Sequence, residues 1–200
     1  MKEANAFKPD MHVVASHNTL WNKFRQGDRP AFAAIYDSHI NDLFHYGMHF
    51  CQDAERVKDC LQDLFQDLWS SRSHLSENII NIKYYLISSL RRRLLRSLKN
   101  ERKRDELLDF EFELTQPQET HLIKQEIIAE QQKLLQQALN TLTRRQREAI
   151  YLRFYQNLSY KEVAEMMDMQ VDSVYNTISK AISILKKTVS LPVVLFFLHK

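Results

Sequence analysis

Residues 158–181 carry the most constraining pattern of the chain, two short amphipathic helices separated by a tight turn. This is the pattern of a helix-turn-helix. Ser159 and Glu162 have capping-box spacing, in which the serine hydroxyl accepts from a backbone N–H of the first turn and the glutamate reaches back to the cap. We therefore expect a helix to begin at Tyr160 and to break at Asp168. The second helix has a polar side that is free to contact a ligand: Ser173, Asn176, Ser179 and Lys180.

Glycine and proline are scarce in the chain, with two and four residues among 200. Because turn-forming residues are so few, the sequence disfavours many short strands and predicts an all-α fold. A hydrophobic share of 44% suits one or two domains with cores of their own. Cys51 and Cys60 are too few for a disulfide framework, and the first twenty residues lack the apolar core of a signal peptide. Both observations predict a cytoplasmic protein.

The expected helices follow a lead-in, residues 1–18, that shows no periodicity and that we expect to be flexible. The first helix begins near Thr19 and stops at Gly27. Asp28 and Pro30 then start a second helix. That helix is predicted to be long and buried, with these residues facing inward: Phe32, Ile35, Tyr36, Leu43, Phe44 and Phe50.

The third expected helix, residues 53–71, has two distinct sides. Its core-facing side carries Val57, Leu61, Leu64 and Leu68. Its other side is acidic and rich in amides, and carries Asp59, Gln62, Asp63, Gln66 and Asp67. Since most charged stripes are simply solvated surface, the residues alone leave two interpretations open, a solvated face and a binding face.

A fourth helix is expected to begin near Ile82 and to be strongly basic. Its cations are Lys83, Arg91, Arg92, Arg93, Arg96, Lys99, Arg102, Lys103 and Arg104, and Glu101 is the one anion in this span. Such a face is typical of phosphate-backbone binding, and Tyr84 and Tyr85 could stack on bases. A solubilising face and a surface for an acidic protein partner are the alternatives.

The charge then inverts in residues 105–121, where six carboxylates and no lysine or arginine occur. We interpret this stretch as an acidic linker between two domains. A helix is expected from Leu122 to Leu139, and Thr143 and Gln146 repeat the capping-box spacing before the next one, which Asn157 ends.

The last residues, 188–200, end in an apolar run that is too short to cross a bilayer, which needs ~20 residues. We expect this tail to pack on the protein or on a partner.

Catalytic patterns are missing from the sequence. It has no glycine-rich phosphate loop, no Gly-x-Ser-x-Gly elbow and no His-Glu-x-x-His helix. His45, His49 and Cys51 could hold a metal, but histidines at this spacing are usually structural and no carboxylate ligand stands between them. We expect neither enzymatic activity nor a bound metal or cofactor.

The order of these segments resembles an extracytoplasmic-function sigma factor of the sigma-70 family. The resemblance is carried by AFAAIYDSHINDLF, VKDCLQDLFQDLW, IKYYLISSLRRRLLRSL and LNTLTRRQREAIYLRFYQNLSYKEVAEMMDMQVDSVYNTISKAISILKK, and is greatest to the group common in Bacteroidetes. It covers residues 19–187 and implies sigma region 2 at residues 19–104 and sigma region 4 at residues 122–187, joined by the linker.

The resemblance also implies roles for individual residues. The acidic stripe matches the segment that docks on the clamp helices of the largest subunit of core RNA polymerase. The loop at residues 70–78 and the helix from Ile82 match the elements that open and read the minus-10 element of promoter DNA, with an unpaired base held in a pocket. The implied DNA contacts there are Tyr84, Arg91, Arg92, Arg93, Arg96 and Lys99. The implied minus-35 contacts are Ser173, Asn176, Thr177 and Lys180. The acidic linker resembles one that threads toward the template and RNA-exit paths.

Some residues depart from the family pattern. Asp168 stands where the turn usually has glycine, and Thr177 stands where many members have arginine. Lys180 is then the one cation early in the recognition helix, and Asp172 near its start repels phosphate unless it serves as a helix-end carboxylate. Weak autonomous minus-35 binding follows, so another DNA-bound protein could be needed for recruitment.

The expected function is promoter-specific initiation by core polymerase, with contacts to its clamp helices and flap region, and an anti-sigma factor as a further partner. Two alternatives remain at this point. One is a helix-turn-helix regulator whose first domain senses a signal, although residues 1–104 show neither an α/β receiver pattern nor a polar-lined pocket domain. The other is an adaptor that uses its second domain only to recruit a protein.

Overall fold

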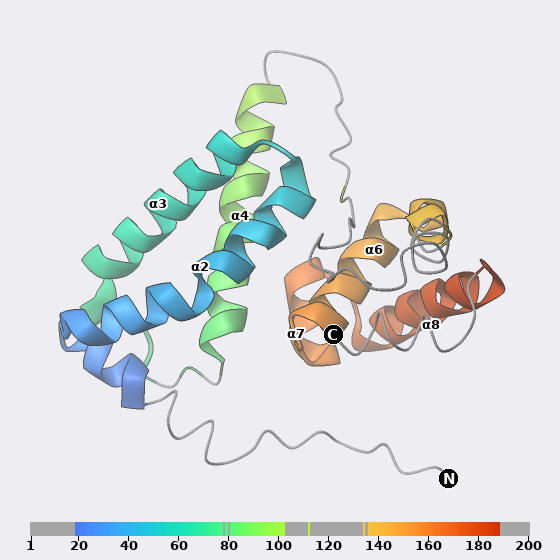
Figure 1. Ribbon diagram of the computed structural model, residues 1–200. Helices are drawn as coiled ribbons and strands as arrows, with labels where there is room; N and C mark the ends of the chain where they lie inside the picture. Colours follow the sequence, from blue (N-terminus) through green and yellow to red (C-terminus); the bar gives the residue numbers. More distant parts are fainter. Residues whose placement is uncertain are drawn as a thin grey trace, which may run out of the picture. The chain divides into compact units, whose positions relative to one another are not determined.

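The computed structural model describes residues 19–77, 79, 81–102, 112, 134 and 136–188. Within these residues the chain is helical and has no strand, so the all-α prediction is confirmed. Contacts divide it into two compact units (Figure 1). The first unit contains the helices up to α4, and the second contains α6, α7 and α8 together with the short segment Met48–Gln52.

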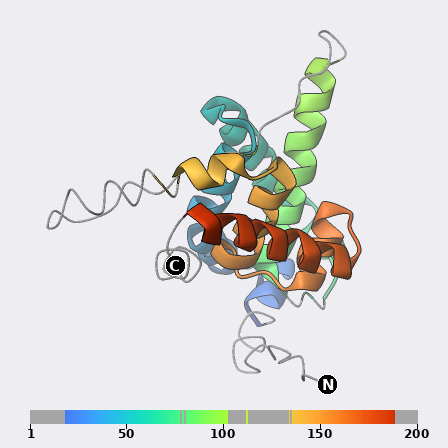
Figure 2. The same ribbon diagram turned by 90° about the vertical axis from the view of Figure 1, so that its right-hand side faces the viewer.

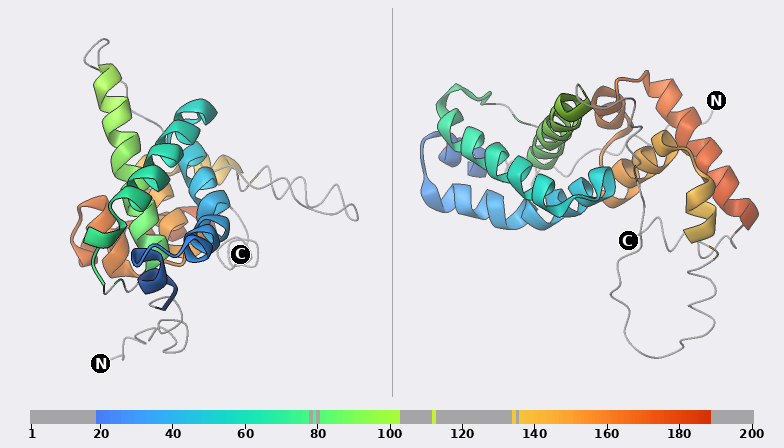
Figure 3. Two further views of the ribbon diagram at one scale, coloured as in Figure 1. Left: turned by 90° about the vertical axis from the view of Figure 1, so that its left-hand side faces the viewer. Right: turned by 90° about the horizontal axis from the view of Figure 1, so that it is seen from above.

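The helices of the first unit have the predicted order. They are a short helix at residues 19–25, α2 (Arg29–Cys51), α3 (Ala54–Ser70), the 3₁₀ turn η1 (Arg72–His74) and α4 (Ile82–Arg102). In the right-hand view of Figure 3, α2 and α3 lie lengthwise and α4 is seen nearly end-on. Gly27 ends the first helix with φ of +92°, a conformation that glycine adopts without strain.

Glycine is also required where α2 passes α3. A Cβ atom placed on Gly47 would lie 2.5 Å from Cγ1 of Val57, closer than packed carbon atoms can approach. The two helices can therefore pack closely, and Val57, Leu61, Leu64 and Leu68 are buried against the rest of the unit as predicted.

Tyr36 is a correction to the predicted core. Its side chain is 40% exposed, whereas its neighbour Ile35 is fully buried. A step of one residue turns a side chain by about 100° around a helix, so Tyr36 leaves the buried stripe of α2. Its ring instead packs edge-on against Phe65 of α3, with ring centroids 4.7 Å apart. Phe32 and Phe44, also predicted to face inward, are half-buried.

The second unit is organised by the two predicted capping boxes, both of which are present at Thr143–Gln146 and Ser159–Glu162. They start α6 (Arg144–Ile150) and α7 (Tyr160–Met167). The chain turns at Asp168, in the left-handed region with φ of 54° and ψ of 56°, and α8 (Val171–Thr188) follows. Figure 2 looks onto α8. Its core side carries Val174, Ile178, Ala181 and Leu185, all buried, while Ile182 is half-buried.

A π-helix at Tyr151–Tyr155 follows α6 directly and was not predicted. It ends before Asn157, which has a positive φ of 56°. Buried Gln156 donates its side-chain amide to the hydroxyl of Tyr151 over 2.9 Å. Burial raises the pKa of the Tyr155 hydroxyl.

Several predictions fall outside the described residues. These concern the N-terminal lead-in, the apolar tail, most of the helix from Leu122 and the acidic linker apart from Phe112. Phe112 is fully buried, and its carbonyl accepts a hydrogen bond from Nε of Arg147. In the described part of the chain, no helix is long and apolar enough to cross a membrane.

Candidate nucleic-acid interface

The acidic stripe lies on the exposed side of α3. Its five residues, Asp59, Gln62, Asp63, Gln66 and Asp67, are all exposed, and the buried residues of the helix lie on its other side. The helix begins at Asp53, whose carboxylate accepts from the backbone N–H of Arg56. This hydrogen bond and the guanidinium of Arg56 lower the pKa of Asp53. The stripe is therefore a continuous polar surface on a well-capped helix.

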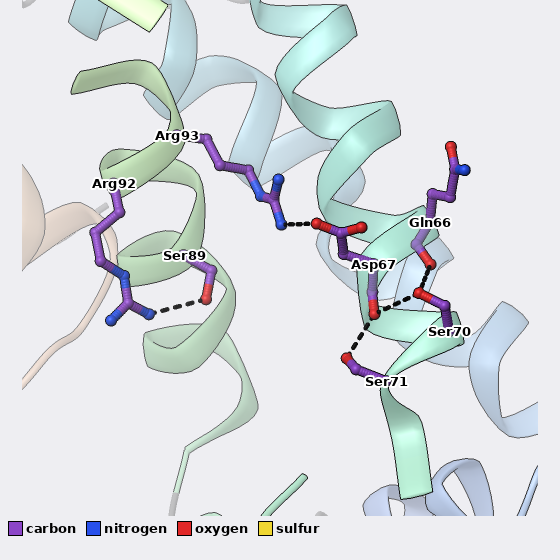
Figure 4. Close-up of polar contacts among 7 residues, drawn as sticks. All are labelled: Gln66, Asp67, Ser70, Ser71, Ser89, Arg92 and Arg93. Carbon is purple, nitrogen blue, oxygen red and sulfur yellow. Dashed lines mark hydrogen bonds and ion pairs between the residues drawn. The ribbon is translucent and has the colours of Figure 1, made fainter. Parts of the chain in front are cut away.

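Asp67 differs from the rest of the stripe because it reaches another helix. Its Oδ2 lies 2.6 Å from Nη2 of Arg93 on α4 (Figure 4). The side chains are 65% and 27% exposed, respectively. Asp67 and Arg93 lie 26 positions apart in the sequence, and their ion pair connects the predicted polymerase-docking residues with the predicted DNA-binding residues.

The basic side of α4 is less uniform than its sequence suggests. Lys83 forms an ion pair with Asp42 at 2.7 Å, and Arg93 is paired with Asp67. The exposed cations are Arg92, Arg96 and Lys99, while Arg91 is half-buried. The side chains of residues 102–104 lie outside the described part. The charge open to solvent is therefore concentrated at Arg92, Arg96 and Lys99.

The two tyrosines at the start of α4 have different surroundings. Tyr84 is half-buried, and its backbone N–H donates to the side-chain oxygen of Asn81, which caps the helix. The ring of Tyr85 stands edge-on to Trp21 with centroids 5.5 Å apart, so part of it belongs to the core. Neither ring is a freely exposed stacking surface.

A groove of about 310 Å³ lies between α3 and α4, in the region where the family resemblance implied a pocket for an unpaired base, but its lining residues were not predicted. Its lining is Leu64, Asp67, Leu68, Ser70, Ser71, Tyr85, Ser89 and Arg93. The hydroxyls of Ser70 and Ser71 donate back to carbonyls of the last turn of α3. Ser89 lies next to Nη2 of Arg92, at 3.3 Å. The groove is thus lined by the apolar Leu64 and Leu68 and by polar side chains, of which Figure 4 shows Asp67, Ser70, Ser71, Ser89 and Arg93.

The loop after α3 is attached to the first helix of its unit. The indole N–H of Trp21 donates to the carbonyl of Ser76 over 2.9 Å, and Arg25 pairs with Glu77 at 3.1 Å. The guanidinium of Arg72 lies 4.5 Å from the ring centroid of Trp69. These contacts hold the described part of the loop beside the groove.

In the second unit, α8 presents the predicted recognition residues to solvent. Ser173, Asn176 and Lys180 are exposed, opposite the buried Val174 and Ile178. Thr177 is half-buried, and its hydroxyl donates to the carbonyl of Ser173 over 2.7 Å. The hydroxyl hydrogen of Thr177 is therefore already used within the helix.

An aromatic stack beside this face was missed from the sequence. The rings of Tyr160 and Tyr175 are parallel within 14°, with centroids 3.7 Å apart, and the guanidinium of Arg153 lies 5.1 Å from the Tyr160 centroid. Tyr175 is still 48% exposed and Val171 is 39% exposed. The positions of Tyr160 and Tyr175, one on each helix of the helix-turn-helix, were the sequence signal that could have indicated the stack. The stack places an exposed aromatic ring next to Asn176.

The histidine cluster does not form a metal site in the described residues, where no group of three potential ligands comes together. His49 packs edge-on against Tyr151, with ring centroids 4.8 Å apart. This contact fits the structural role favoured from the sequence.

Two family models match the chain. Residues 35–104 match Sigma-70 region 2, and residues 132–185 match Sigma-70, region 4. The chain belongs to the sigma-70 family. Together the matches include α3, α4 and the helix-turn-helix of this sigma factor, and thus every residue predicted to contact polymerase or DNA.

Relatives place the protein in the extracytoplasmic-function (ECF) group. The ECF RNA polymerase sigma factor SigK of Mycolicibacterium vanbaalenii is 21% identical over 176 residues, which cover 88% of this chain and 90% of the relative. The ECF RNA polymerase sigma factor SigX of Bacillus subtilis is 24% identical over 164 residues, covering 80% and 84%. This protein is an RNA polymerase sigma factor, so the function expected from the sequence is confirmed in preference to a sensor domain joined to a helix-turn-helix.

Two solved structures share the fold. CnrH, in complex with the cytosolic domain of CnrY, has a TM-score of 0.56 at 18% identity, covering 85% of this chain and 94% of the other. The sigma factor RpoE from Bartonella quintana, in complex with the anti-sigma factor NepR, has a TM-score of 0.51 at 18% identity, covering 90% and 97%.

Proposed function

We propose that this sigma factor docks on core polymerase through the acidic stripe of α3 and contacts the minus-10 and minus-35 elements with α4 and α8. The observation that carries this proposal is that α3 and α4 of one unit expose opposite charges. The acidic stripe suits a basic protein surface, and Arg92, Arg96 and Lys99 suit a phosphate backbone. One small unit can then hold polymerase and DNA at the same time.

The groove between α3 and α4 is the proposed site for an unpaired base of the minus-10 element. Leu64 and Leu68 in its lining are apolar, as a base face requires, and the hydroxyl oxygens of Ser70, Ser71 and Ser89 can accept hydrogen bonds from a base edge. Arg92 and Arg96 nearby on α4 would follow the backbone. With the groove holding a base and these arginines contacting phosphates, recognition of the minus-10 element does not depend on Tyr84 alone.

The second unit is the proposed reader of the minus-35 element. Asn176 can form paired hydrogen bonds with adenine in the major groove, and Lys180 can contact guanine or a phosphate. Residues 171–181 contain one cation, Lys180, and one anion, Asp172. Contact of this unit with the polymerase flap region, or with another DNA-bound protein, would compensate for this weak charge.

An anti-sigma factor is a further proposed partner. Both structural neighbours are complexes, and one of them contains a named anti-sigma factor. We also assign the chain to the group common in Bacteroidetes, on the sequence resemblance alone. The proposed domain limits remain residues 19–104 for region 2, 105–121 for the linker and 122–187 for region 4.

Runoff transcription on a promoter library, with reconstituted holoenzyme, tests these assignments. We expect transcripts from promoters that share two elements, with melted bases near the downstream one detected by permanganate reactivity. Transcripts that share only the downstream element would contradict the role proposed for α8. Absence of a melted segment near that element would contradict the role proposed for the groove.

A further inference from the structure

Asp67 and Arg93 belong to two different proposed contact sites but are bound to each other. Asp67 ends the acidic stripe, and Arg93 lies within the basic face of α4. Their side chains meet at 2.6 Å on the wall of the groove (Figure 4). While this ion pair is closed, the charge of each side chain is largely cancelled by the other.

The ion pair can open without disturbing the fold. Asp67 is held by its backbone, because its carbonyl accepts from the N–H of Ser71 at 2.9 Å and from the hydroxyl of Ser71 at 2.6 Å. Its carboxylate, in contrast, is 65% exposed, and the arginine side chain is 27% exposed. Opening therefore needs only a change of side-chain rotamers, since α3 and α4 remain packed through buried leucines.

We propose that this ion pair couples polymerase docking to DNA binding. A polymerase cation that binds Asp67 releases Arg93, which is then free to bind a DNA phosphate. In the sigma factor alone, Asp67 masks Arg93 and lowers the affinity for DNA. The proposal rests on the docking role of α3 and the DNA-binding role of α4 described above.

Coupling of this kind is reciprocal. If docking releases Arg93 for DNA, then removal of Arg93 must release Asp67 for polymerase. The size of both effects is limited by the strength of a partly exposed ion pair, which corresponds to about two- to fivefold in affinity. Two independent measurements, one on each ligand, can therefore test the same contact.

The first measurement uses the full chain without polymerase and a short DNA duplex of random sequence. Asp67→Asn is compared with Asp63→Asn, which removes the same charge one turn earlier on the same exposed face. Among the described residues, Asp63 has no ion pair. We expect Asp67→Asn to bind DNA about two- to fivefold more tightly than Asp63→Asn, with a salt slope steeper by about 0.9.

A double variant isolates the pair. Asp67→Asn combined with Arg93→Gln should bind DNA no more tightly than Asp63→Asn combined with Arg93→Gln, because the masked arginine is gone. An equal gain in both backgrounds would show a general effect of charge and would overturn the proposal. Weaker DNA binding by Asp67→Asn would also overturn it, since the aspartate would then hold Arg93 in place for DNA.

The second measurement is the affinity for core polymerase. Arg93→Gln is compared with Arg96→Gln, which removes the same charge from an exposed position three residues along α4. We expect Arg93→Gln to bind polymerase about two- to fivefold more tightly, and Arg96→Gln to bind as the parent does. Equal affinities of the two variants for polymerase would contradict the proposed coupling. If instead Asp59→Lys and Asp63→Lys leave polymerase binding intact, the docking site itself is misassigned, whatever the state of the ion pair.

Discussion

The helices α4 and α8, one in each unit, expose different chemistry to the same proposed ligand. The described part of α4 exposes the cations Arg92, Arg96 and Lys99. The outer side of α8 exposes Ser173 and Asn176, with the aromatic stack beside them. Cations attract any phosphate backbone, whereas amides and hydroxyls distinguish bases. From this difference we expect the first unit to supply most of the affinity for DNA and the second to supply a base preference.

The largest expected effect concerns the first unit and polymerase. Reversing Asp63 and Asp67 to lysine should abolish binding to core polymerase, because two like charges would face the proposed basic surface of the partner. Binding is measured by co-purification, and helicity by circular dichroism. Glu165→Lys on α7 is a single charge reversal in the second unit and should retain binding. Normal binding of a folded Asp63→Lys/Asp67→Lys variant would remove the docking assignment.

The next effect concerns the cations of α4. Alanine at Arg92 and Arg96 should reduce the salt slope of promoter binding by holoenzyme by about two units, one for each lost phosphate contact. The loss should be similar on all promoter sequences. Titrating holoenzyme with promoter DNA at several salt concentrations gives the slope. An unchanged slope would mean that these arginines face solvent in the complex.

A smaller and sequence-dependent effect is expected on α8. Asn176→Ala should relax the base preference at one upstream position, by about 1–3 kcal/mol if the amide forms two bonds to a base. Comparing holoenzyme affinity across single-base variants of an upstream element measures this. Ser183→Ala, two turns further along α8, is the control. An equal loss of affinity for all sequences would show that Asn176 contacts the DNA backbone and not a base.

The smallest effect is expected at the turn of the helix-turn-helix. Asp168 has a left-handed backbone, which glycine adopts at lower cost than aspartate. Asp168→Gly should therefore stabilise the second unit by up to about 1 kcal/mol and leave the first unit unchanged. Thermal unfolding detects the shift. A loss of stability would show that the aspartate side chain makes a favourable contact that exceeds the backbone strain.

Local features of the fold could be predicted from the sequence because their causes lie within a few residues. Both capping boxes and the turn at Asp168 depend on neighbours in the chain, and all three are present. The same holds for Val57, Leu61, Leu64 and Leu68 of α3, which follow helical spacing and are buried. The prediction that Tyr36 is buried was wrong, because a residue one position away from the buried stripe of a helix points toward solvent. Its ring is only partly covered, by Phe65 of α3.

Features of the candidate site that join distant residues could not be predicted. The Asp67–Arg93 ion pair depends on the register between α3 and α4, which the sequence does not encode locally. For the same reason the basic face was expected to be uniform, although Lys83 and Arg93 have acidic partners. The Tyr160–Tyr175 stack depends on the crossing of α7 and α8. Charge patterns thus located the surfaces but not the pairings within them.

Both tryptophans of the chain, Trp21 and Trp69, lie in the first unit and border the loop beside the groove. The indole of Trp21 is hydrogen-bonded to Ser76 of that loop, and the ring of Trp69 lies under Arg72. Selective excitation of indole therefore gives an emission signal from this loop and none from the helix-turn-helix. Stopped-flow fluorescence on the unlabelled protein can therefore follow changes around this loop separately from events on α8.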